Sequence, residues 1–314
     1  MIRRRHEKRQ HAHYCLLVNK VATNHDPTLV TKLTSAIRKK GGFYTIYESD
    51  SASELIQKAE IACRLKWRSR PLPDYLQQRG PITALVACGG DGTFNLAAQA
   101  ALAAELPVGV LPMGRFNNIA RSLLEPFDME TAIQKILQRA YRRIDTASVA
   151  GRLVVGSIGV GFIPEIARLL QGKKLPKFAF RWSQLGAQAA TAAQAKKVVL
   201  KIDSFRFELR PTILNINLLP YSVGLRLSPV SIFDDRRAET IFDVGRNAKD
   251  FSSFVRLIYK EKYVYGEGIR LFRGGTVTFQ TAKGQTAYLD GEFVDLQANI
   301  VEVQVNEKQL KVFC

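Results

Sequence analysis

The chain has 314 residues, and a hydrophobic content of 46% is enough to bury a core in one large or two modest domains. Its formal net charge of +18 predicts attraction to something anionic, such as nucleic acid, an acidic membrane surface or a phosphorylated ligand. All four histidines lie in the first 25 residues, which argues against a Ser-His-Asp hydrolase or a His-ligated metal enzyme in the body of the chain.

The four cysteines have no CxxC spacing, so neither a disulfide framework nor a zinc site is indicated, and a reducing cytoplasm is the expected location. No run of about 18 apolar residues occurs. We therefore expect a cytoplasmic protein that is water-soluble and associates peripherally with membranes.

After a basic tail over residues 1–13, the first half alternates strand-like and helix-like segments. Asp26 and Pro27 are typical of the start of a helix, as N-cap and first-turn residue. Strands are predicted over 14–20, 43–48, 83–88 and 107–112, and helices over 28–40, 51–67 and from the glycine-rich loop to about Glu105. This alternation predicts an α/β domain with a parallel sheet over residues 14–143.

From about Ile144 the pattern changes to short β-like runs interrupted by helical segments. Strands are predicted over 152–158, 197–202, 205–210, 212–218, 276–281, 286–290 and 299–305, and helices over 163–170, 179–195 and 248–259. The pattern indicates a second, antiparallel β-rich and sandwich-like domain with helical insertions over 144–303, before residues 304–314 return to the first domain.

The loop Gly89-Gly90-Asp91-Gly92-Thr93 lies between a predicted strand and a predicted helix. Its glycines let backbone N–H groups approach a ligand, and the helix adds a positive N-terminal end, which together favour an anion site. A plain strand-to-helix turn with Asp91 as N-cap explains the same residues equally well. The loop matches neither a Walker motif nor the Rossmann fingerprint.

A second glycine loop, "PMGRFNNIAR", follows the next strand and places Gly114, Asn117 and Asn118 at the same edge of the predicted sheet. Such edges are where α/β sheets bind ligands, so two adjacent polar loops favour a ligand over two plain turns. Near the C-terminus, "YLDGEF" predicts a hairpin at Asp290-Gly291. Asp290 and Glu292 flank the glycine, so one could act as a base while the other orients a hydroxyl or engages a metal.

The order of "GGDGT", "PMGRFNNIAR" and "LDGE" resembles the diacylglycerol kinase catalytic family, and the similarity spans most of the chain. The resemblance implies an N-terminal NAD kinase-like α/β nucleotide domain and a β-rich lipid-substrate domain, with ATP and Mg²⁺ in the cleft. It implies nucleotide contacts from Asn19, Gly89, Gly90, Asp91, Gly92, Thr93, Asn95, Gly114, Arg115 and Asn117. It also implies that Asp290 takes the proton of the lipid hydroxyl, with Glu292 beside it.

The sequence departs from the family pattern in these loops. Arg115 stands where the family usually has Thr, Asn118 where it has Asp, and Leu96 where a Glu often follows the glycine loop. Lys20 replaces an early Pro and Thr23 a Gly. The additional positive charges of Lys20 and Arg115 predict either that phosphates are bound in a different way or that the protein is a family member with lost or altered activity.

In the second domain, "SIFDDRRAET" resembles the family's metal-binding D-D-G-x-L-D loop, with Arg236 in place of Gly. This resemblance makes Asp235 the candidate magnesium ligand outside the cleft.

A segment that mixes basic and aromatic residues is the candidate membrane-contact surface, because cations attract anionic headgroups and aromatic rings settle at the interface. Its residues are Lys173, Lys174, Lys177, Phe178, Phe180, Arg181 and Trp182. An amphipathic core helix with one solvated face is the alternative interpretation of the same pattern.

The leading hypothesis is thus an ATP-dependent kinase that phosphorylates a lipid alcohol, such as diacylglycerol, at an anionic membrane surface. A catalytically degenerate member that binds nucleotide or lipid, and an NAD kinase-like enzyme that shares "GGDGT", are the alternatives. No nucleic-acid-binding motif is recognised, so we expect no nucleic-acid partner. A homodimer is compatible with the sequence.

Overall fold

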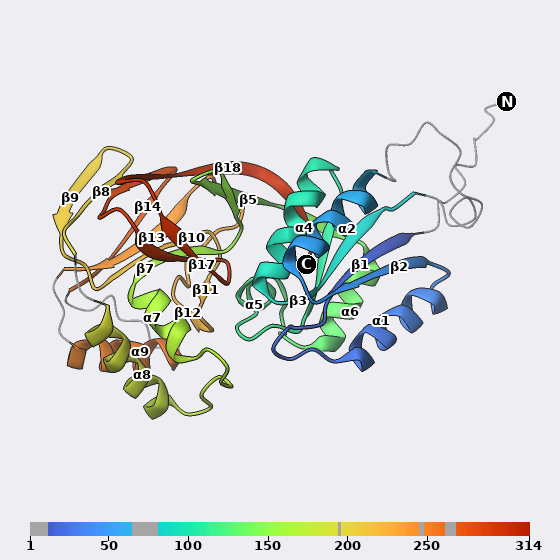
Figure 1. The fold of residues 1–314 in the computed structure, drawn as a ribbon, viewed down its shortest axis with the longest axis horizontal. Helices are drawn as coiled ribbons and strands as arrows, with labels where there is room; N and C mark the ends of the chain where they lie inside the picture. The colour runs from blue at the N-terminus through green and yellow to red at the C-terminus, as the bar shows by residue number, and fades with distance from the viewer. Residues whose placement is uncertain (1–11, 65–80, 194–195, 245–247, 261–267) are drawn as a thin grey trace.

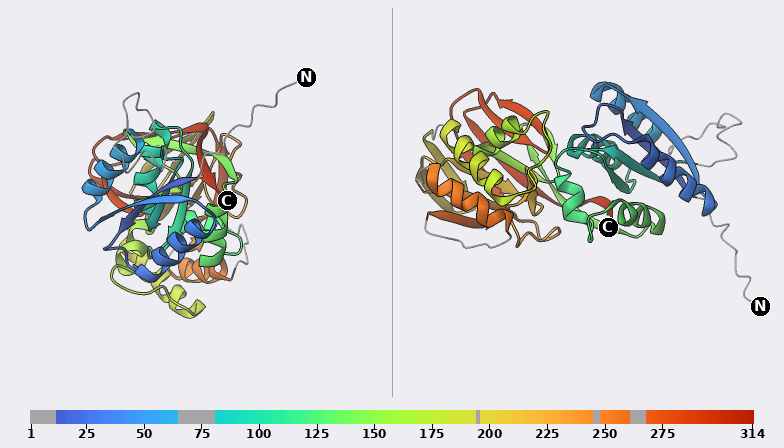
Figure 2. Two further views of the ribbon diagram at one scale, coloured as in Figure 1. Left: turned by 90° about the vertical axis from the view of Figure 1, so that its right-hand side faces the viewer. Right: turned by 90° about the horizontal axis from the view of Figure 1, so that it is seen from below.

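The computed structural model describes residues 12–64, 81–193, 196–244, 248–260 and 268–314. The molecule is elongated, with an α/β part at one end and a β-rich part at the other (Figure 1). Figure 2 shows from below that the two parts lie side by side along the long axis. The expected tail over residues 1–13 falls almost entirely outside the described residues.

The α/β part is built on four parallel strands in the order β2-β1-β3-β4. Its elements are β1 (His13–Asn19), α1 (Pro27–Lys39), β2 (Phe43–Ser49), α2 (Ala52–Arg64), β3 (Ala84–Gly89), α4 (Asp91–Ala103), β4 (Val108–Pro112), α5 (Asn118–Leu123) and α6 (Met129–Gln138). Helices α1 and α6 contact each other, as do α2 and α4, and the two pairs cover opposite faces of the sheet (Figure 1). The strands β1, β3 and β4 are buried on both sides, as their continuous apolar runs require, whereas β2 at the edge of the sheet is partly exposed.

Helix α1 begins where its sequence signals predict. The Asp26 carboxylate accepts a hydrogen bond from the Thr28 backbone N–H at 2.8 Å, and Pro27 is the first helical residue. Because β3 and β4 are parallel neighbours, the two glycine loops that follow them lie at the same edge of the sheet. The α/β part therefore brings together loops that are about 25 residues apart in the sequence.

The β-rich part contains a six-stranded antiparallel sheet in the order β14-β13-β10-β7-β16-β17. Its strands are β7 (Ser157–Gly161), β10 (Ile213–Asn217), β13 (Ala238–Asp243), β14 (Ile269–Gly274), β16 (Gln285–Leu289) and β17 (Glu292–Leu296). One face packs on a second sheet through an apolar core, and the other packs on the helices α7 (Phe162–Leu169), α8 (Ala179–Ala192) and α9 (Ala248–Tyr259). This is the predicted sandwich with helical insertions. A separate short ribbon pairs β11 (Tyr221–Ser222) with β12 (Leu225–Arg226).

One long strand, β18 (Ile300–Phe313), connects the two parts. It pairs with β4 of the parallel sheet and with β15 (Thr276–Gln280) of the sandwich, and β5 (Tyr141–Val149) runs antiparallel beside it. The second sheet of the sandwich, completed by β6 (Arg152–Val154), β8 (Val198–Ile202) and β9 (Phe205–Leu209), is thus continuous with the parallel sheet. The boundary expected near Ile144 falls inside β5 and stays a prediction.

The expected fold class, an α/β domain followed by an antiparallel β-rich domain, is confirmed. Within the described residues, no helix is both long and apolar enough to cross a lipid bilayer.

Candidate active site

The two glycine loops touch each other at the edge of the parallel sheet. A Cβ atom added to Gly114 would lie 2.3 Å from the Gly90 Cα, so neither position has room for a side chain. The Met113 N–H donates to the Gly89 carbonyl at 2.8 Å, which extends the strand pairing into the loops. The glycines at positions 90 and 114 are therefore required by the approach of one loop to the other.

Asparagine side chains fix both loops in place. Asn19, at the end of β1, donates to the Thr93 hydroxyl at 3.1 Å. Asn24 donates to the Gly114 carbonyl at 2.6 Å, and Asn117 both accepts from the N–H and donates to the carbonyl of that glycine. These amides hold the backbone that would face a ligand.

Asp91 is buried at the start of α4 and connects the first loop to α5. Its carboxylate accepts from the Ile119 backbone N–H at 2.9 Å and from the Asn118 amide at 3.1 Å. Burial raises the pKa of Asp91 to about 6, against the opposing effect of these hydrogen bonds. Asp91 is thus a carboxyl group at the base of the loops that gains or loses its proton at mildly acidic pH.

The hairpin of β16 and β17 places its tip against α4. Leu289 pairs with Glu292 across a two-residue turn in which Asp290 and Gly291 have φ values of 44° and 100°. Such angles suit Asp-Gly, as predicted for this turn. A Cβ atom on Gly291 would lie 3.2 Å from the Gly92 nitrogen, so the tip fits closely against the glycine loop.

The Asp290 carboxylate lies in a pocket of hydrogen-bond donors behind the hairpin tip. One oxygen accepts from the Gly156 and Ser157 N–H groups at 2.8 and 2.9 Å. The other accepts from the Val155 N–H at 2.6 Å and from the Asn95 amide at 2.8 Å. Burial raises the pKa of Asp290, and the four hydrogen bonds oppose that rise.

A cleft of about 270 Å³ opens between the glycine loops and the hairpin. Its lining includes the predicted residues Asn19, Gly90, Asp91, Gly92, Thr93, Gly114, Arg115 and Glu292. Leu96 also faces it, at the position where the family often has Glu. The structure thus brings eight of the twelve predicted cleft residues to one surface, from both parts of the molecule.

Arg115 is the cation of this cleft, and its Nε is a buried nitrogen that has no hydrogen-bond partner among the described residues. Its guanidinium lies 5.9 Å from the Phe116 ring centroid. Lys20, the other additional cation, instead pairs with Asp50 at 3.2 Å on the surface and does not line the cleft. Only Arg115 of these two therefore offers its charge to a ligand in the cleft.

Four predicted residues support the cleft without lining it: Gly89, Asn95, Asn117 and Asp290. Asn95 contacts the Leu153 carbonyl and the Asp290 carboxylate, so it positions another predicted residue. Gly89 is packed against Thr93, where an added Cβ would lie 2.4 Å from the hydroxyl oxygen.

Sequence reasoning did not single out Tyr288 or Phe116, which also line the cleft. Their rings meet edge to face with centroids 6.3 Å apart, and burial raises the pKa of Tyr288. Both residues stand inside motifs that the sequence did single out. Their role in the cleft wall depends on the contact between the two parts, which no local spacing reveals.

The predicted membrane-contact segment is exposed at six of its seven residues. Phe178 and Phe180 are 64% and 55% exposed and stack with centroids 6.1 Å apart, and Arg181 lies over the Phe180 ring. Trp182 corrects the prediction: it is buried, its indole N–H donates to the Pro176 carbonyl at 3.1 Å, and it packs near Tyr259 of α9. It is a core residue because α9 covers that face of α8.

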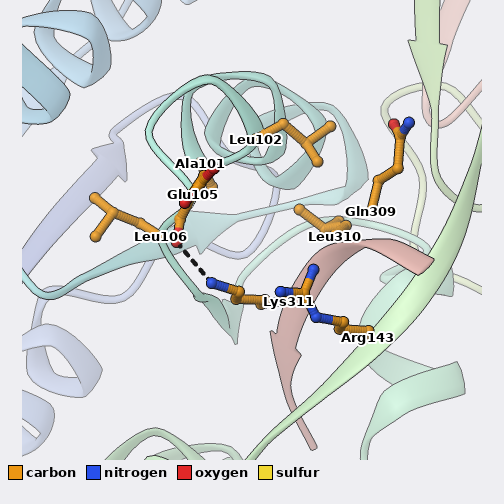
Figure 3. Close-up of a pocket in the computed structure, with 8 residues that line it drawn as sticks. All are labelled: Ala101, Leu102, Glu105, Leu106, Arg143, Gln309, Leu310 and Lys311. Carbon is orange, nitrogen blue, oxygen red and sulfur yellow. Dashed lines mark hydrogen bonds between the residues drawn. The ribbon is translucent and has the colours of Figure 1, made fainter.

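A second pocket, of about 390 Å³, lies at the C-terminal end of α4 (Figure 3). None of the predicted site residues lines it. Figure 3 shows the Lys311 amine reaching the Glu105 carbonyl, at 3.1 Å, in the turn that follows α4. A lysine in this place complements the negative end of a helix. The larger pocket is therefore separate from the predicted chemistry.

Residues 13–149 match the family model described as the diacylglycerol kinase catalytic domain. Over these residues the chain is similar to that family. A diacylglycerol kinase of Staphylococcus saprophyticus is 21% identical over 215 residues, which cover 67% of this chain and 70% of that protein. One of Staphylococcus epidermidis is 22% identical over 236 residues, covering 73% of each.

Solved structures share this fold over almost the whole chain. A diacylglycerol kinase from Bacillus anthracis aligns with a TM-score of 0.69 at 13% identity, covering 97% of this chain and 96% of that one. Another structure from the same organism reaches a TM-score of 0.73 at 17% identity, covering 97% of each chain. At these identities the likeness shows the fold, and the chemistry must be argued from the cleft.

Proposed function

We propose that the protein is an ATP-dependent lipid kinase that transfers the γ-phosphoryl group to the hydroxyl of a lipid such as diacylglycerol or a related lipid alcohol. The observation that carries this proposal is the polar cleft between the glycine loops and the hairpin, with the unpartnered Nε of Arg115 in its wall. Phosphoryl transfer depends mainly on positioning and charge stabilisation, which such a cleft supplies.

The cleft residues fit a nucleotide with Mg²⁺ in their chemistry. Arg115 is a donor without a partner that suits phosphate oxygens, and Glu292 is a carboxylate at the same surface that suits a divalent cation. Both oxygens of Asp91 already accept hydrogen bonds, so Asp91 holds the loops rather than the cation. Mg²⁺, when bound, would neutralise charge on the phosphates. The backbone of the two loops, held by Asn19 and Asn117, would orient the nucleotide.

Asp290 is proposed as the group that accepts the proton of the lipid hydroxyl. Its burial favours proton binding, since it raises the pKa, and its position behind Gly291 places it next to the glycine loop. In the structure its oxygens accept four hydrogen bonds. A hydroxyl must therefore replace one donor, and the side-chain amide of Asn95 is the one that can rotate away.

The exposed basic and aromatic segment is proposed to bring the cleft to an anionic membrane surface. Leu175, within this segment, and Phe116, in the cleft wall, flank Gly224, where an added Cβ would lie 3.2 and 3.4 Å from them. The exposed Phe178 and Phe180 stand a few residues after Leu175 in the same segment. A lipid that leaves the membrane here would reach the cleft without crossing the molecule.

A second candidate function is a binding role without turnover. Two observations favour it: Leu96 faces the cleft where the family often has a carboxylate, and the oxygens of Asp290 are fully occupied by donors. Such a protein would bind nucleotide or lipid as a sensor.

The deciding experiment incubates the purified protein with γ-labelled ATP, Mg²⁺ and a panel of lipid alcohols in anionic vesicles. We expect labelled phospholipid from the wild type, and a loss of about 100-fold or more in kcat for Asp290→Asn, because a proton acceptor contributes on this order. Glu292→Gln is the matched control, with a smaller loss, and thermal unfolding establishes that each variant is folded.

Two other results would decide against this proposal. Transfer to NAD in place of lipid would assign the NAD kinase-like activity. Nucleotide binding without transfer to any lipid would assign the binding role.

A further inference from the structure

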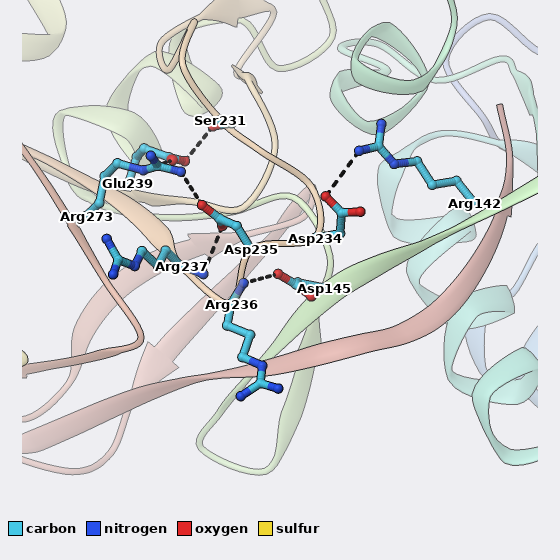
Figure 4. A network of polar contacts seen from close by, with 9 residues as sticks. All are labelled: Arg142, Asp145, Ser231, Asp234, Asp235, Arg236, Arg237, Glu239 and Arg273. Carbon is cyan, nitrogen blue, oxygen red and sulfur yellow. Dashed lines mark hydrogen bonds and ion pairs between the residues drawn. The ribbon is translucent and has the colours of Figure 1, made fainter.

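The loop at the junction of the two parts carries an acidic cluster that the family resemblance associates with a magnesium ion at Asp235. Figure 4 shows this cluster between β5, β13 and β14. A divalent cation at this cluster needs about six oxygen ligands, so the carboxylates must have oxygens that no other group occupies.

The Arg273 guanidinium bridges the two carboxylates that face each other in the cluster. It forms an ion pair with Asp235, and its Nε donates to Glu239 at 3.0 Å (Figure 4). The Glu239 side chain is fully buried, and the Arg273 side chain is 30% exposed. A planar guanidinium suits such paired carboxylates because its donors form a fixed fork.

The remaining carboxylate oxygens also have partners. The second Glu239 oxygen accepts from the Ser231 hydroxyl at 2.6 Å, and the second Asp235 oxygen accepts from the Arg237 backbone N–H at 3.1 Å. All four oxygens of the pair are therefore engaged. Within the part of the chain that the structure describes, no group of three or more His, Cys, Asp or Glu residues is arranged to hold a metal ion.

The sheet register fixes Arg273 in this place. Glu239 on β13 and Arg273 on β14 are direct partners in an antiparallel pair, so their side chains share one face of the sheet. The guanidinium cannot leave without breaking its contacts with Glu239 on β13 and with Asp235 in the loop before that strand. It is a permanent cation of the cluster.

Arg236, which replaces the glycine of the family loop, is accommodated by compensating contacts. It has a φ of 62°, in the left-handed region, and its N–H donates to Asp145 at 2.6 Å. The other Asp145 oxygen accepts from the Lys308 N–H of β18 at 2.7 Å, and the Arg236 side chain pairs with Glu307. The loop is thus fastened to β5 and β18 by the chain's own donors.

We infer that Arg273 takes the place of a divalent cation at Asp235 and Glu239, so that the junction is held by an internal guanidinium and binds no metal. Any divalent cation that the protein uses then acts elsewhere, and the rigidity of the junction does not depend on metal supply. The inference is independent of the proposed kinase activity, because it concerns the stability of the fold.

A double-mutant cycle in the presence of EDTA tests it, with Asp235→Asn, Arg273→Met and the double variant compared by thermal unfolding. We expect Arg273→Met to lower Tm by about 5 °C, because it leaves Glu239 buried without its cation. The two single shifts should be non-additive, since the residues interact directly. Arg237→Met removes the same charge from a neighbouring exposed side chain and should leave Tm nearly unchanged.

A second comparison, of Tm in EDTA and in Mg²⁺, distinguishes metal binding at the junction from metal binding in the cleft. The shift in Tm between EDTA and Mg²⁺ should be equal in the wild type and in Asp235→Asn. If the wild type loses stability on chelation and Asp235→Asn removes that sensitivity, Asp235 holds a metal and the inference fails. Additive single shifts would also overturn it. If the Arg273→Met variant does not fold, Arg273→Lys takes its place in the cycle. Lysine keeps the positive charge but lacks the paired donors of the guanidinium.

Discussion

Asp91 is a buried carboxyl that titrates in an accessible pH range. Its pKa is raised to about 6, mainly by burial, so the folded state binds the proton more tightly than the unfolded chain does. The stabilisation is complete below about pH 4 and is lost as the pH rises through 6. We expect the free energy of unfolding to fall by about 3 kcal/mol over this interval on account of Asp91.

Urea unfolding of the wild type and of Asp91→Asn at a series of pH values measures this contribution. The variant should show a shallower pH dependence, with a residual slope of the same sign from Asp290, whose pKa is also raised. Identical slopes for the wild type and Asp91→Asn would contradict the assignment.

The sequence identified Asp91 but not its partners. The spacing within "GGDGT" is compatible with a ligand contact and with a helix cap, and the hydrogen bond to Ile119 spans 28 residues. The same limit applies to Asn95, which holds Asp290 from 195 residues away. Motif order predicted which residues gather at the cleft, because the parallel strands bring their ends together. It could not separate residues that face the cleft from residues that support them.

Helix α8 packs through Trp182 and presents Phe180 to solvent. Trp182 is 1% exposed and Phe180 is 55% exposed, although they stand two positions apart in a segment that reads as uniformly basic and aromatic. Trp182→Ala should lower the free energy of unfolding by about 3–5 kcal/mol, because it empties a large volume in the core between the helices and the sheet. Phe180→Ala should change it by less than about 0.5 kcal/mol.

Denaturant unfolding of both variants distinguishes the two environments. Equal losses would mean that Phe180 is also covered in the folded protein, and equal small effects would mean that Trp182 is not a core residue. Because α9, which follows α8 by more than 50 residues, covers Trp182, local periodicity could not assign the two faces of α8.

The whole molecule depends on β18, which the sequence predicted only in part. The run over 299–305 was expected as a strand and 304–314 as a return to the first domain, and the structure joins them in one strand, Ile300–Phe313. A register shift between Asn306 and Leu310 lets it pair with β5 along both parts. Elements with strong local patterns were therefore predictable, while the single sheet that links the parts rests on non-local pairing.

The distribution of the +18 charge over the molecule yields the last prediction. The basic and aromatic segment around the start of α8 belongs to the β-rich part, whereas the helix α1 belongs to the α/β part (Figure 1). Replacing Lys173, Lys174 and Lys177 together by Gln should weaken binding to vesicles containing phosphatidylglycerol by roughly 100-fold, because each lysine near an anionic surface contributes about 1 kcal/mol. Binding by the wild type should also weaken as salt increases.

The matched control replaces three exposed lysines of the α1 region, Lys32, Lys39 and Lys40, by Gln. Both triple variants carry the same net charge, so a general attraction between a cationic protein and an anionic surface would weaken equally in the two. Docking through the segment before α8 requires that only the first variant loses binding in vesicle co-sedimentation. The double variant Phe178→Ser/Phe180→Ser should reduce the vesicle binding that the protein retains at high salt, because salt does not screen the contribution of aromatic side chains to binding at the membrane interface.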